Sequence, residues 1–296
     1  MEFSLDPELL GLLDNVALVT AGGAGIGQAT AIQLARAGCH VAVVDIDGAA
    51  ARSTAERIEG LGRRSVAIEA DACDAAAVKD FVAQARRALG PLDVAANVVG
   101  GTLFMKPFLD LTREDWNRVI ERNVFTAAFG CQAEGIAMIE DGRKGRIVNV
   151  ASSSGIVGSP NIVPYGVAKA GLIHMTKSVA MELAPYGLRV NCVVPGTHET
   201  VRTRQMATGP DAGVREFYAA AAKAPPLGRL GDPMETAGVA VFLASSLSSY
   251  VTGHIVVSDG GVTHTTHRPP VGGGLELPQA LAHIPGLREP ASSDSQ

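Results

Sequence analysis

Short apolar segments alternate with longer segments of helical character along most of this chain. The apolar segments are residues 16–19, 41–44, 65–68, 92–96, 146–150, 188–193 and 254–257. Segments that are apolar throughout are typical of parallel strands that are covered on both faces. Regular β-α-β alternation also requires right-handed crossovers. We therefore predict an α/β fold with a single doubly wound, Rossmann-type sheet of seven parallel strands and helices on both faces.

Two segments interrupt this alternation. Residues 197–230 contain no predicted strand and follow a strand end, where open α/β sheets keep their ligand crevice, so we expect a substrate lid there. Residues 264–296 are rich in Pro, Gly and Ser, which predicts an irregular C-terminal tail. The sequence thus predicts one catalytic domain over 1–263 and a tail over 264–296. The leucines at 9–13 are expected to pack on the edge of the sheet.

Composition excludes several classes of protein. Hydrophobic residues make up 47% and charged residues 19% of the chain, which is ample material for a buried core and excludes a wholly disordered chain. A net charge of −5 without a long basic run argues against a nucleic-acid partner. No apolar stretch reaches transmembrane length, and the N-terminus lacks the pattern of a secretory signal, so no membrane association is expected.

Cysteine usage indicates the compartment. Cys39, Cys73, Cys131 and Cys192 are far apart and form no Cys-x-x-Cys pair, so we interpret them as reduced thiols of a cytoplasmic protein. His264 and His267 have a spacing seen in metal sites but no third ligand nearby, so no metal is expected.

A glycine cluster at Thr20–Gly27 separates the first predicted strand from the first predicted helix. Glycines let the backbone approach a pyrophosphate, which then binds the free N–H groups of the helix N-terminus. Asp45 ends the second predicted strand, 20 residues after Gly25. A carboxylate at that offset binds the ribose hydroxyls and repels a 2′-phosphate, and no Arg or Lys directly follows it. We therefore predict NAD(H), rather than NADP(H), as the cofactor.

Tyr165 and Lys169 are four residues apart in a helical segment, so their side chains face the same way. A tyrosine with a pKa of about 10 is a poor base at neutral pH, but a neighbouring ammonium stabilises its phenolate. Ser152 lies at the end of a predicted strand, 13 residues before Tyr165, where its hydroxyl can hold a substrate oxygen. These three residues predict proton transfer at a substrate oxygen.

Together these motifs resemble the short-chain dehydrogenase/reductase family over about residues 12–263. The family's glycine motif matches Thr20–Gly27, its Asn-Asn-Ala-Gly motif falls on Asn97–Gly100, and its Pro-Gly segment falls on Asn191–Gly196. The resemblance implies a catalytic tetrad of Asn123, Ser152, Tyr165 and Lys169. It also implies a cofactor site formed by Ala21, Gly25, Ile26, Gly27, Asp45, Asp71, Ala72, Asn97, Gly100, Tyr165, Lys169, Pro195, Gly196, His198 and Thr200.

The chain departs from the family pattern at three places. Ala21 replaces the first glycine of the glycine motif, and its methyl group is expected to fit if φ is negative. Val98 and Val99 replace Asn-Ala in the second motif. His198 stands where the family has an apolar residue whose backbone meets the nicotinamide amide. Either the backbone of His198 alone matters, or its ring makes a polar contact near the reacting carbon.

The resemblance implies a mechanism. Tyr165, as phenolate, takes the hydroxyl proton of a secondary alcohol while Ser152 binds the same oxygen and hydride passes to the nicotinamide. Lys169 lowers the pKa of Tyr165 and holds the ribose, and Asn123 anchors a water that links Lys169 to solvent. The expected substrate is a small-molecule secondary alcohol or ketone, with alicyclic and steroid-like compounds among the candidates. The substrate pocket is expected to include Leu103, Ser154, Ile162 and Met206.

Other interpretations stay open. A 3-oxoacyl-thioester reductase is one alternative, although such enzymes usually use NADPH, and a non-catalytic NAD sensor is another, which the complete tetrad opposes. Basic residues of the lid could bind an anionic substrate group or lie in solvent: Arg202, Arg204, Arg215 and Lys223. The family commonly forms tetramers through two long helices, here at about 112–139 and 164–184, so a homotetramer is expected. Apolar residues on the first helix fit an interface: Val119, Val124, Phe125 and Phe129.

Overall fold

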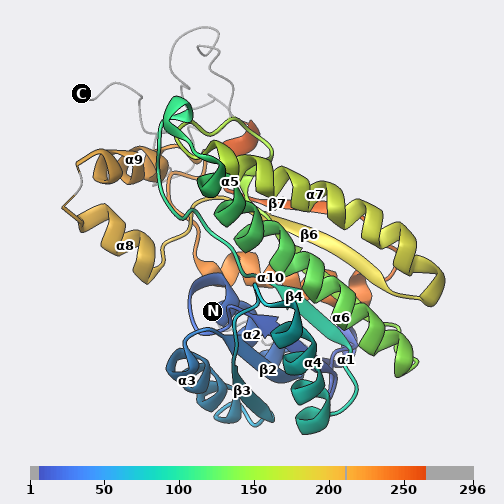
Figure 1. Ribbon diagram of the computed structural model, residues 1–296. Coiled ribbons are helices and arrows are strands. Elements are labelled where there is room, and N and C mark those ends of the chain that lie inside the picture. The colour runs from blue at the N-terminus through green and yellow to red at the C-terminus, as the bar shows by residue number, and fades with distance from the viewer. Residues whose placement is uncertain (1–6, 211, 265–296) are drawn as a thin grey trace, which may run out of the picture. The chain divides into compact units, whose positions relative to one another are not determined.

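The computed structural model describes residues 7–210 and 212–264, and its centre is one sheet of seven parallel strands (Figure 1). The strands are β1 (Val16–Thr20), β2 (His40–Asp45), β3 (Ser65–Glu69), β4 (Val94–Asn97), β5 (Arg146–Val150), β6 (Arg189–Pro195) and β7 (Ile255–Ser258). Their order in the sheet is β3-β2-β1-β4-β5-β6-β7. The predicted doubly wound sheet is therefore confirmed, with each strand end within two residues of its predicted position.

The strand order reverses between β1 and β4, because the chain first builds outward to β3 and then returns to continue on the other side. At such a reversal the loops after the two neighbouring strands diverge and leave a crevice at the carboxyl ends. The glycine cluster follows β1 and the Asn97–Gly100 motif follows β4. The topology thus brings two of the sequence motifs to one crevice.

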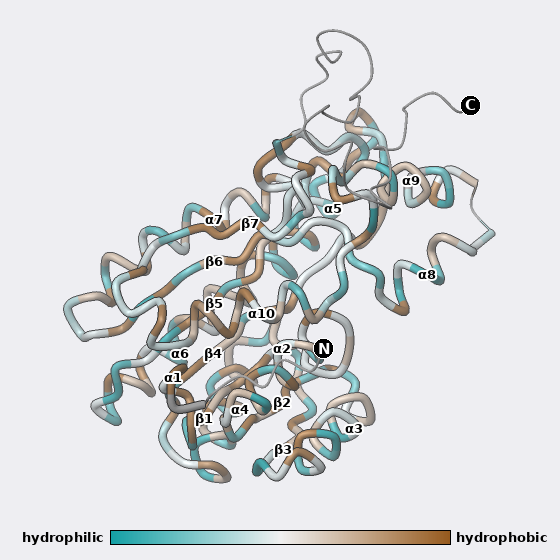
Figure 2. Tube along the Cα trace, turned by 180° about the vertical axis from the view of Figure 1, so that it is seen from behind, coloured by the Kyte–Doolittle hydropathy of each residue, from teal (hydrophilic) through white to brown (hydrophobic). Residues whose placement is uncertain are grey.

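Helices cover both faces of the sheet. One face carries α2 (Gly25–Arg36), α3 (Gly48–Glu59) and α10 (Pro233–Ala244), and the other carries α4 (Ala75–Leu89), α6 (Thr126–Glu140) and α7 (Val163–Leu183). Successive residues of β1 point to opposite faces, so Ala17 and Val19 pack in the first core and Val16 and Leu18 in the second. Figure 2 shows the strands as hydrophobic segments between these helices.

The remaining elements are short. They are α1 (Pro7–Leu10), α5 (Arg113–Ile120), α8 (Val201–Thr208), α9 (Ala212–Lys223), a π turn η2 (Glu121–Phe125) and the 3₁₀ turns η1 (Phe108–Asp110), η3 (Ser153–Gly155), η4 (Ala184–Tyr186), η5 (Ser246–Ser248) and η6 (Val262–His264). The helix expected over 112–139 is thus α5 and α6 joined through the π turn. The segment 197–230 contains α8 and α9 and lies beyond the carboxyl end of β6 (Figure 1).

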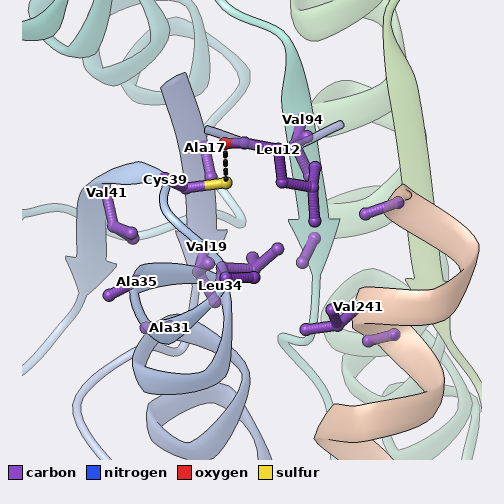
Figure 3. Close-up of a cluster of buried hydrophobic side chains, with 14 of the residues drawn as sticks. Leu12, Ala17, Val19, Ala31, Leu34, Ala35, Cys39, Val41, Val94 and Val241 are labelled. Carbon is purple, nitrogen blue, oxygen red and sulfur yellow. Dashed lines mark hydrogen bonds between the residues drawn. The ribbon is translucent and has the colours of Figure 1, made fainter. Parts of the chain in front are cut away.

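From the sequence we expect the N-terminal leucines to pack at the edge of the sheet, but the structure places them elsewhere. Leu10 and Leu12 are buried in the core beside β1 and β4, which are central strands, while Leu9 and Leu13 are exposed. Figure 3 shows Leu12 between these strands, with its carbonyl oxygen accepting a hydrogen bond from the Cys39 thiol at 3.5 Å. The prediction was wrong because β1, the first strand in the chain, pairs on both sides and lies in the middle of the sheet.

Contacts within the chain set the unit Met1–Thr263 apart from the residues that follow. Residues 265–296, where the sequence predicts most of the tail and the second histidine of the His264–His267 pair, lie outside the described residues. None of the described helices is both long enough and apolar enough to cross a membrane. The cysteines Cys39, Cys73, Cys131 and Cys192 are free thiols.

Candidate active site

The turn between β1 and α2 has the geometry of a phosphate-binding loop. Gly25 has a φ of +55°, and a Cβ on Gly27 would lie 1.9 Å from the carbonyl oxygen of Ala21, so both positions require glycine. Ala24 precedes the first turn of α2 and offers no side-chain acceptor to its N–H groups. These donors therefore stay available to an anion at the helix N-terminus.

Ala21 contradicts the expectation of a negative φ. Its φ is +53°, in the left-handed region that costs an L-residue about 1 kcal/mol. The conformation is imposed from both sides, because Gly22 N–H donates to the Val44 carbonyl at 3.0 Å and Gly27 packs on the Ala21 carbonyl. The glycine usual in the family at this position therefore has a steric reason, and the methyl group here is accommodated with backbone strain.

Asp45 lies at the cleft beside this loop. Its Oδ2 accepts a hydrogen bond from Gly23 N–H at 2.9 Å, and its Oδ1 accepts one from Asp47 N–H at 3.0 Å. Each carboxylate oxygen keeps further acceptor capacity for a ribose hydroxyl. The cleft is lined by Ala21, Val44, Asp45, Ile46, Ala70, Asp71, Ala72, Val99, Gly100 and Arg122. The N–H donors of the glycine loop and the acceptors of Asp45 fit the phosphates and ribose hydroxyls of a dinucleotide.

Arg122 lines the same cleft, and the sequence motifs did not indicate it. It lies in the π turn directly before Asn123, and its charge lowers the pKa of the Cys73 thiol, which burial raises to about 11. Arg122 therefore lies on the Asp71–Cys73 side of the cleft. No sequence signal connects residue 122 with Asp71, because only the packing of the π turn against the loop after β3 brings them together.

Asn123 is held at the crevice by backbone hydrogen bonds. Its Oδ1 accepts from Gly101 N–H at 2.8 Å, and its Nδ2 donates to the Gly101 carbonyl at 3.2 Å and to the Val119 carbonyl at 3.0 Å. The π turn places Asn123 here by interrupting the regular helix, a device frequent at functional sites. A Cβ on Gly100 would lie 2.7 Å from both Asn123 Oδ1 and Lys169 Nζ, so Asn123, Gly100 and Lys169 converge.

Tyr165, Ser152 and Lys169 also lie together. The Ser152 side chain lies close enough to the Tyr165 phenol to lower its pKa, and Lys169 Nζ lies 5.9 Å from the centroid of the Tyr165 ring and donates to the Val150 carbonyl at 3.0 Å. Burial lowers the pKa of Lys169 to about 8. Burial also raises the pKa of Tyr165, which outweighs the opposite effects of Ser152 and of the charge of Arg202. The expectation that Tyr165 has a lowered pKa is therefore wrong for the protein alone.

The segment after β6 faces the glycine loop. Pro195 ends β6, and a Cβ on Gly196 would lie 2.9 Å from the backbone of Asp259. Thr200 caps α8 by accepting from Thr203 N–H at 3.1 Å, and its methyl group would lie 3.6 Å from a Cβ on Gly25. Thr200 therefore lies next to Gly25 of the glycine loop.

The ring of His198 turns away from this cleft. The imidazole is buried, with Nδ1 3.0 Å from the Gly196 carbonyl oxygen and Nε2 2.7 Å from Thr236 Oγ1 on α10. Burial lowers its pKa, which favours the neutral ring. Because both nitrogens are occupied, only the backbone of His198 is available to a ligand, and its ring is not a candidate base.

Asn97 does not present its side chain to the cleft. Its Nδ2 donates to Glu134 Oε2 at 2.9 Å and to Asn149 Oδ1 at 3.2 Å, and Asn149 Nδ2 donates to Thr176 Oγ1 at 3.1 Å. Glu134 on α6 is fully buried, and burial raises its pKa to about 7. In the described part of the chain, Glu134 Oε1 and Asn97 Oδ1 have no hydrogen-bond partner. Sequence reasoning missed Glu134, which has no motif around it.

The substrate side is a cavity of about 190 Å³ under the segment 197–230. It is lined by Gly101, Thr102, Met105, Ile162, Arg202, Met206 and Tyr218. Ile162 and Met206 were predicted there, but Leu103 and Ser154 do not line it. Ser154 instead belongs to the turn η3, where its N–H donates a hydrogen bond to Ser152 Oγ at 3.2 Å. Its carbonyl oxygen packs against Gly166.

The profile of a family described as enoyl-(acyl carrier protein) reductase matches residues 20–263. L-rhamnose 1-dehydrogenase (NAD(P)(+)) of Azotobacter vinelandii is 39% identical to this chain over 255 residues, which is 85% of this chain and 97% of the relative. Cyclohexanol dehydrogenase of an Acinetobacter species is 36% identical, over 84% of this chain and 95% of the relative.

Solved structures agree with these relatives. A crystal structure described as a putative short-chain dehydrogenase/reductase from Burkholderia xenovorans superposes with a TM-score of 0.81 at 34% sequence identity. The match covers 87% of this chain and 99% of that one. The similarity therefore extends over most of the chain.

Proposed function

This chain belongs to the short-chain dehydrogenase/reductase family, and from that premise we propose that it is an NAD-dependent oxidoreductase that interconverts a secondary alcohol and its ketone. The observation that carries the proposal is that Ser152 and Lys169 both lie beside the Tyr165 phenol, and that Lys169 converges with Asn123 on Gly100, which lines the dinucleotide cleft. A bound nicotinamide supplies the hydride acceptor or donor. Fold alone would not support this activity, because one fold serves many functions.

The chain's own residues supply acid-base chemistry. In the oxidative direction, the Tyr165 phenolate takes the hydroxyl proton of the alcohol, and the Ser152 hydroxyl donates a hydrogen bond to the same oxygen. Lys169 provides a positive charge near the phenolate, and its position depends on the Val150 carbonyl and on the neighbouring Asn123. Because burial raises the pKa of Tyr165 and lowers that of Lys169 to about 8, the rate of oxidation is expected to rise with pH while Lys169 is charged and to level off above about pH 8.

A screen for dehydrogenase activity tests the proposed reaction. Compact alicyclic alcohols, dihydrodiols, steroids and 3-hydroxyacyl thioesters are offered with NAD⁺ or NADP⁺, and reduced cofactor is followed by its absorbance. We expect oxidation of compact alicyclic alcohols with NAD⁺, because the cavity of about 190 Å³ suits a compact molecule better than a steroid. Fastest turnover of the thioesters with NADP⁺ would instead identify a 3-oxoacyl-thioester reductase, and no turnover of any compound contradicts the proposal.

Preference for NAD over NADP rests on Asp45. A 2′-phosphate near this carboxylate meets a like charge, whereas ribose hydroxyls can donate to it. We expect NAD⁺ to bind at least about tenfold more tightly than NADP⁺ in calorimetric titrations, which is about 1.4 kcal/mol. Asp45→Asn should narrow this ratio, because it removes the charge that repels a 2′-phosphate. Equal binding of the two cofactors by the wild type contradicts this assignment.

We also infer a homotetramer in the cytoplasm. A groove of about 800 Å³ with mostly apolar walls lies between α4, α6 and α7, and Phe125, Ile136 and Met181 expose 46%, 56% and 78% of their area nearby on these helices or the adjoining π turn. Val119 is buried and does not contribute. Such surface suits an interface between copies of the chain, and free thiols suit a reducing compartment. Light scattering that gives a mass near 30.5 kDa would refute the oligomer.

A further inference from the structure

The arginines of the segment 197–230 differ in their partners. Arg204 Nε donates to the Glu199 carboxylate at 2.9 Å, and Arg215 Nη1 donates to the Gly209 carbonyl at 2.7 Å. Arg202 Nη2 donates to the Thr102 carbonyl at 2.6 Å, and Arg202 forms no ion pair with a carboxylate of the described residues. Its charge is therefore not compensated by a direct partner, unlike that of Arg204.

Arg202 faces the substrate cavity. Among the described residues that line the cavity, it is the only charged side chain, and a Cβ on Gly101 would lie 3.2 Å from its Nη1. The other walls are the apolar side chains of Met105, Ile162 and Met206 together with Tyr218. Arg202 itself is exposed where it borders these apolar side chains, so its charge is accessible to an anion that enters the cavity from solvent.

The guanidinium is also electrostatically coupled to the proposed base. The charge of Arg202 lowers the pKa of Tyr165 and that of Tyr218, against the larger effect of burial on both phenols. Arg202 and Tyr165 are therefore close enough for both to contact one small substrate. A substrate whose hydroxyl meets Ser152 and Tyr165 extends into the cavity that Arg202 borders.

Acidic side chains near the cavity are already neutralised. Asp115 accepts from Lys106 Nζ at 2.7 Å, next to Met105, and Glu199 accepts from Arg204. These carboxylates therefore do not compete for Arg202. A guanidinium offers planar N–H groups that match a carboxylate in a bidentate arrangement, so the ligand chemistry that fits here is an organic carboxylate.

We propose that Arg202 binds a carboxylate group of the substrate, so that the enzyme prefers a compact hydroxy acid to the matching neutral alcohol. This inference rests on the proposed function and names the substrate class of the same site. The carboxylate pairs with Arg202, the carbon skeleton lies against Met105, Ile162 and Met206, and the hydroxyl reaches Ser152 and Tyr165. Arg202 is thus a specificity-determining residue.

A matched pair of substrates tests this assignment. The wild type and its variants are offered 3-hydroxycyclohexanecarboxylate and its methyl ester with NAD⁺, and the ratio of kcat/KM for acid over ester is measured. We expect the wild type to prefer the acid and Arg202→Gln to lower the ratio by about 10- to 100-fold. Arg202→Lys should fall between them because it keeps the charge but loses the planar fork. The ratio cancels any general effect of Arg202 on Tyr165, which acts on both substrates.

Arg204→Gln is the matched control, because Arg204 lies on the same helix and pairs with Glu199 outside the cavity. It should change the ratio by less than about twofold, as expected of an exposed ion pair. A second readout avoids turnover: calorimetry should detect cyclohexanecarboxylate binding to the wild type and to Arg204→Gln, and at least about tenfold weaker binding to Arg202→Gln.

The outcomes separate the two proposals. An unchanged ratio in Arg202→Gln, or a wild type that prefers the ester, overturns the carboxylate assignment while leaving the dehydrogenase activity in place. Oxidation of neutral alcohols with no oxidation of the acid overturns it in the same way. Absence of turnover for acid, ester and neutral alcohols, with either cofactor, overturns the proposed function itself.

Discussion

Among the described residues, α7 contributes to two clusters of buried or half-buried polar side chains. The first is the candidate catalytic cluster of Asn123, Ser152, Tyr165 and Lys169, at the carboxyl ends of the strands. The second, which we call the Glu134 cluster, comprises Asn97, Cys131, Glu134, Asn149 and Thr176 between the sheet and α6. Lys169 and Thr176 are seven residues apart on α7, so they lie on one face of that helix, two turns apart.

The two clusters bury opposite charges. Lys169 in the catalytic cluster has a pKa lowered from 10.5 to about 8, and Glu134 has a pKa raised from 4.5 to about 7, in both cases because burial disfavours the charged form. At the catalytic cluster the charge borders a cleft that a ligand can enter. At Glu134 it borders only protein. The same physical effect therefore serves chemistry in one cluster and acts on stability alone in the other.

The largest expected effect distinguishes the clusters by activity. Tyr165→Phe removes the proton acceptor and keeps the ring, so turnover should fall by about 10³-fold while folding and NAD⁺ binding persist. Glu134→Gln should keep turnover within about twofold, because Glu134 touches neither the cleft nor the cavity. Steady-state kinetics and calorimetric cofactor titrations measure both. A Tyr165→Phe enzyme with most of its activity would mean that another group is the base.

The second effect concerns stability against pH. Glu134 has a folded pKa above its unfolded value, so the folded state binds more protons between pH 4.5 and about 7, and stability falls as pH rises through that window. The loss amounts to about 3 kcal/mol. The free energy of unfolding, measured with denaturant at pH 5 and pH 8, should therefore fall by about 3 kcal/mol less in Glu134→Gln than in the wild type.

Glu140→Gln provides the control for this measurement. Glu140 lies on the same helix, but it is exposed and pairs with Arg86 at 3.1 Å. Its substitution should therefore leave the pH dependence of the free energy of unfolding as it is in the wild type. If Glu134→Gln keeps the full loss between pH 5 and pH 8, the Glu134 carboxyl does not titrate as its burial indicates.

The smallest expected effect comes from Lys169. Its folded pKa lies below its unfolded value, so the unfolded state binds more protons between about pH 8 and 10.5, and stability rises through that window, opposite in sign to Glu134. Lys169→Met removes the buried charge but leaves the Val150 carbonyl without its donor, so at pH 7 we expect a net gain of about 1 kcal/mol.

The Lys169→Met enzyme should be inactive, and its stability should lack the rise above pH 8 that this residue causes. Thermal melts at pH 7 and pH 9.5 measure both effects on stability. A marked loss of stability at pH 7 would show that the hydrogen bond to the Val150 carbonyl outweighs the cost of burying the ammonium.

Several parts of the site could be predicted because they depend on local spacing. Tyr165 and Lys169 share a helix, the glycine cluster occupies one turn, and Asp45 ends a strand, so chain position alone indicated their neighbourhood. Glu134 could not be predicted in the same way. Its burial depends on Asn97 from β4, 37 residues earlier in the chain, and on the packing of α6 against the sheet.

The direction of His198 and the conformation of Ala21 were also beyond sequence reasoning. The ring of His198 is turned by Thr236, which is 38 residues later and belongs to another helix. The φ of Ala21 is set by the close approach of Gly27 and by the hydrogen bond to β2, neither of which is visible in the residue itself. In both cases the conformation depends on a contact with a residue whose position the sequence motif does not specify.

The amino-acid sequence by itself determined the doubly wound sheet and the order of its motifs, and it indicated that Tyr165 and Lys169 share one helix face, because hydrophobic period, glycine positions and helical spacing act over a few residues. Only the tertiary structure decided which charges are buried and which side chains meet. It placed Arg202 on the substrate cavity, Arg122 on the dinucleotide cleft and Glu134 in the core. These outcomes depend on desolvation and on contacts between distant segments, which exist only after the chain has packed.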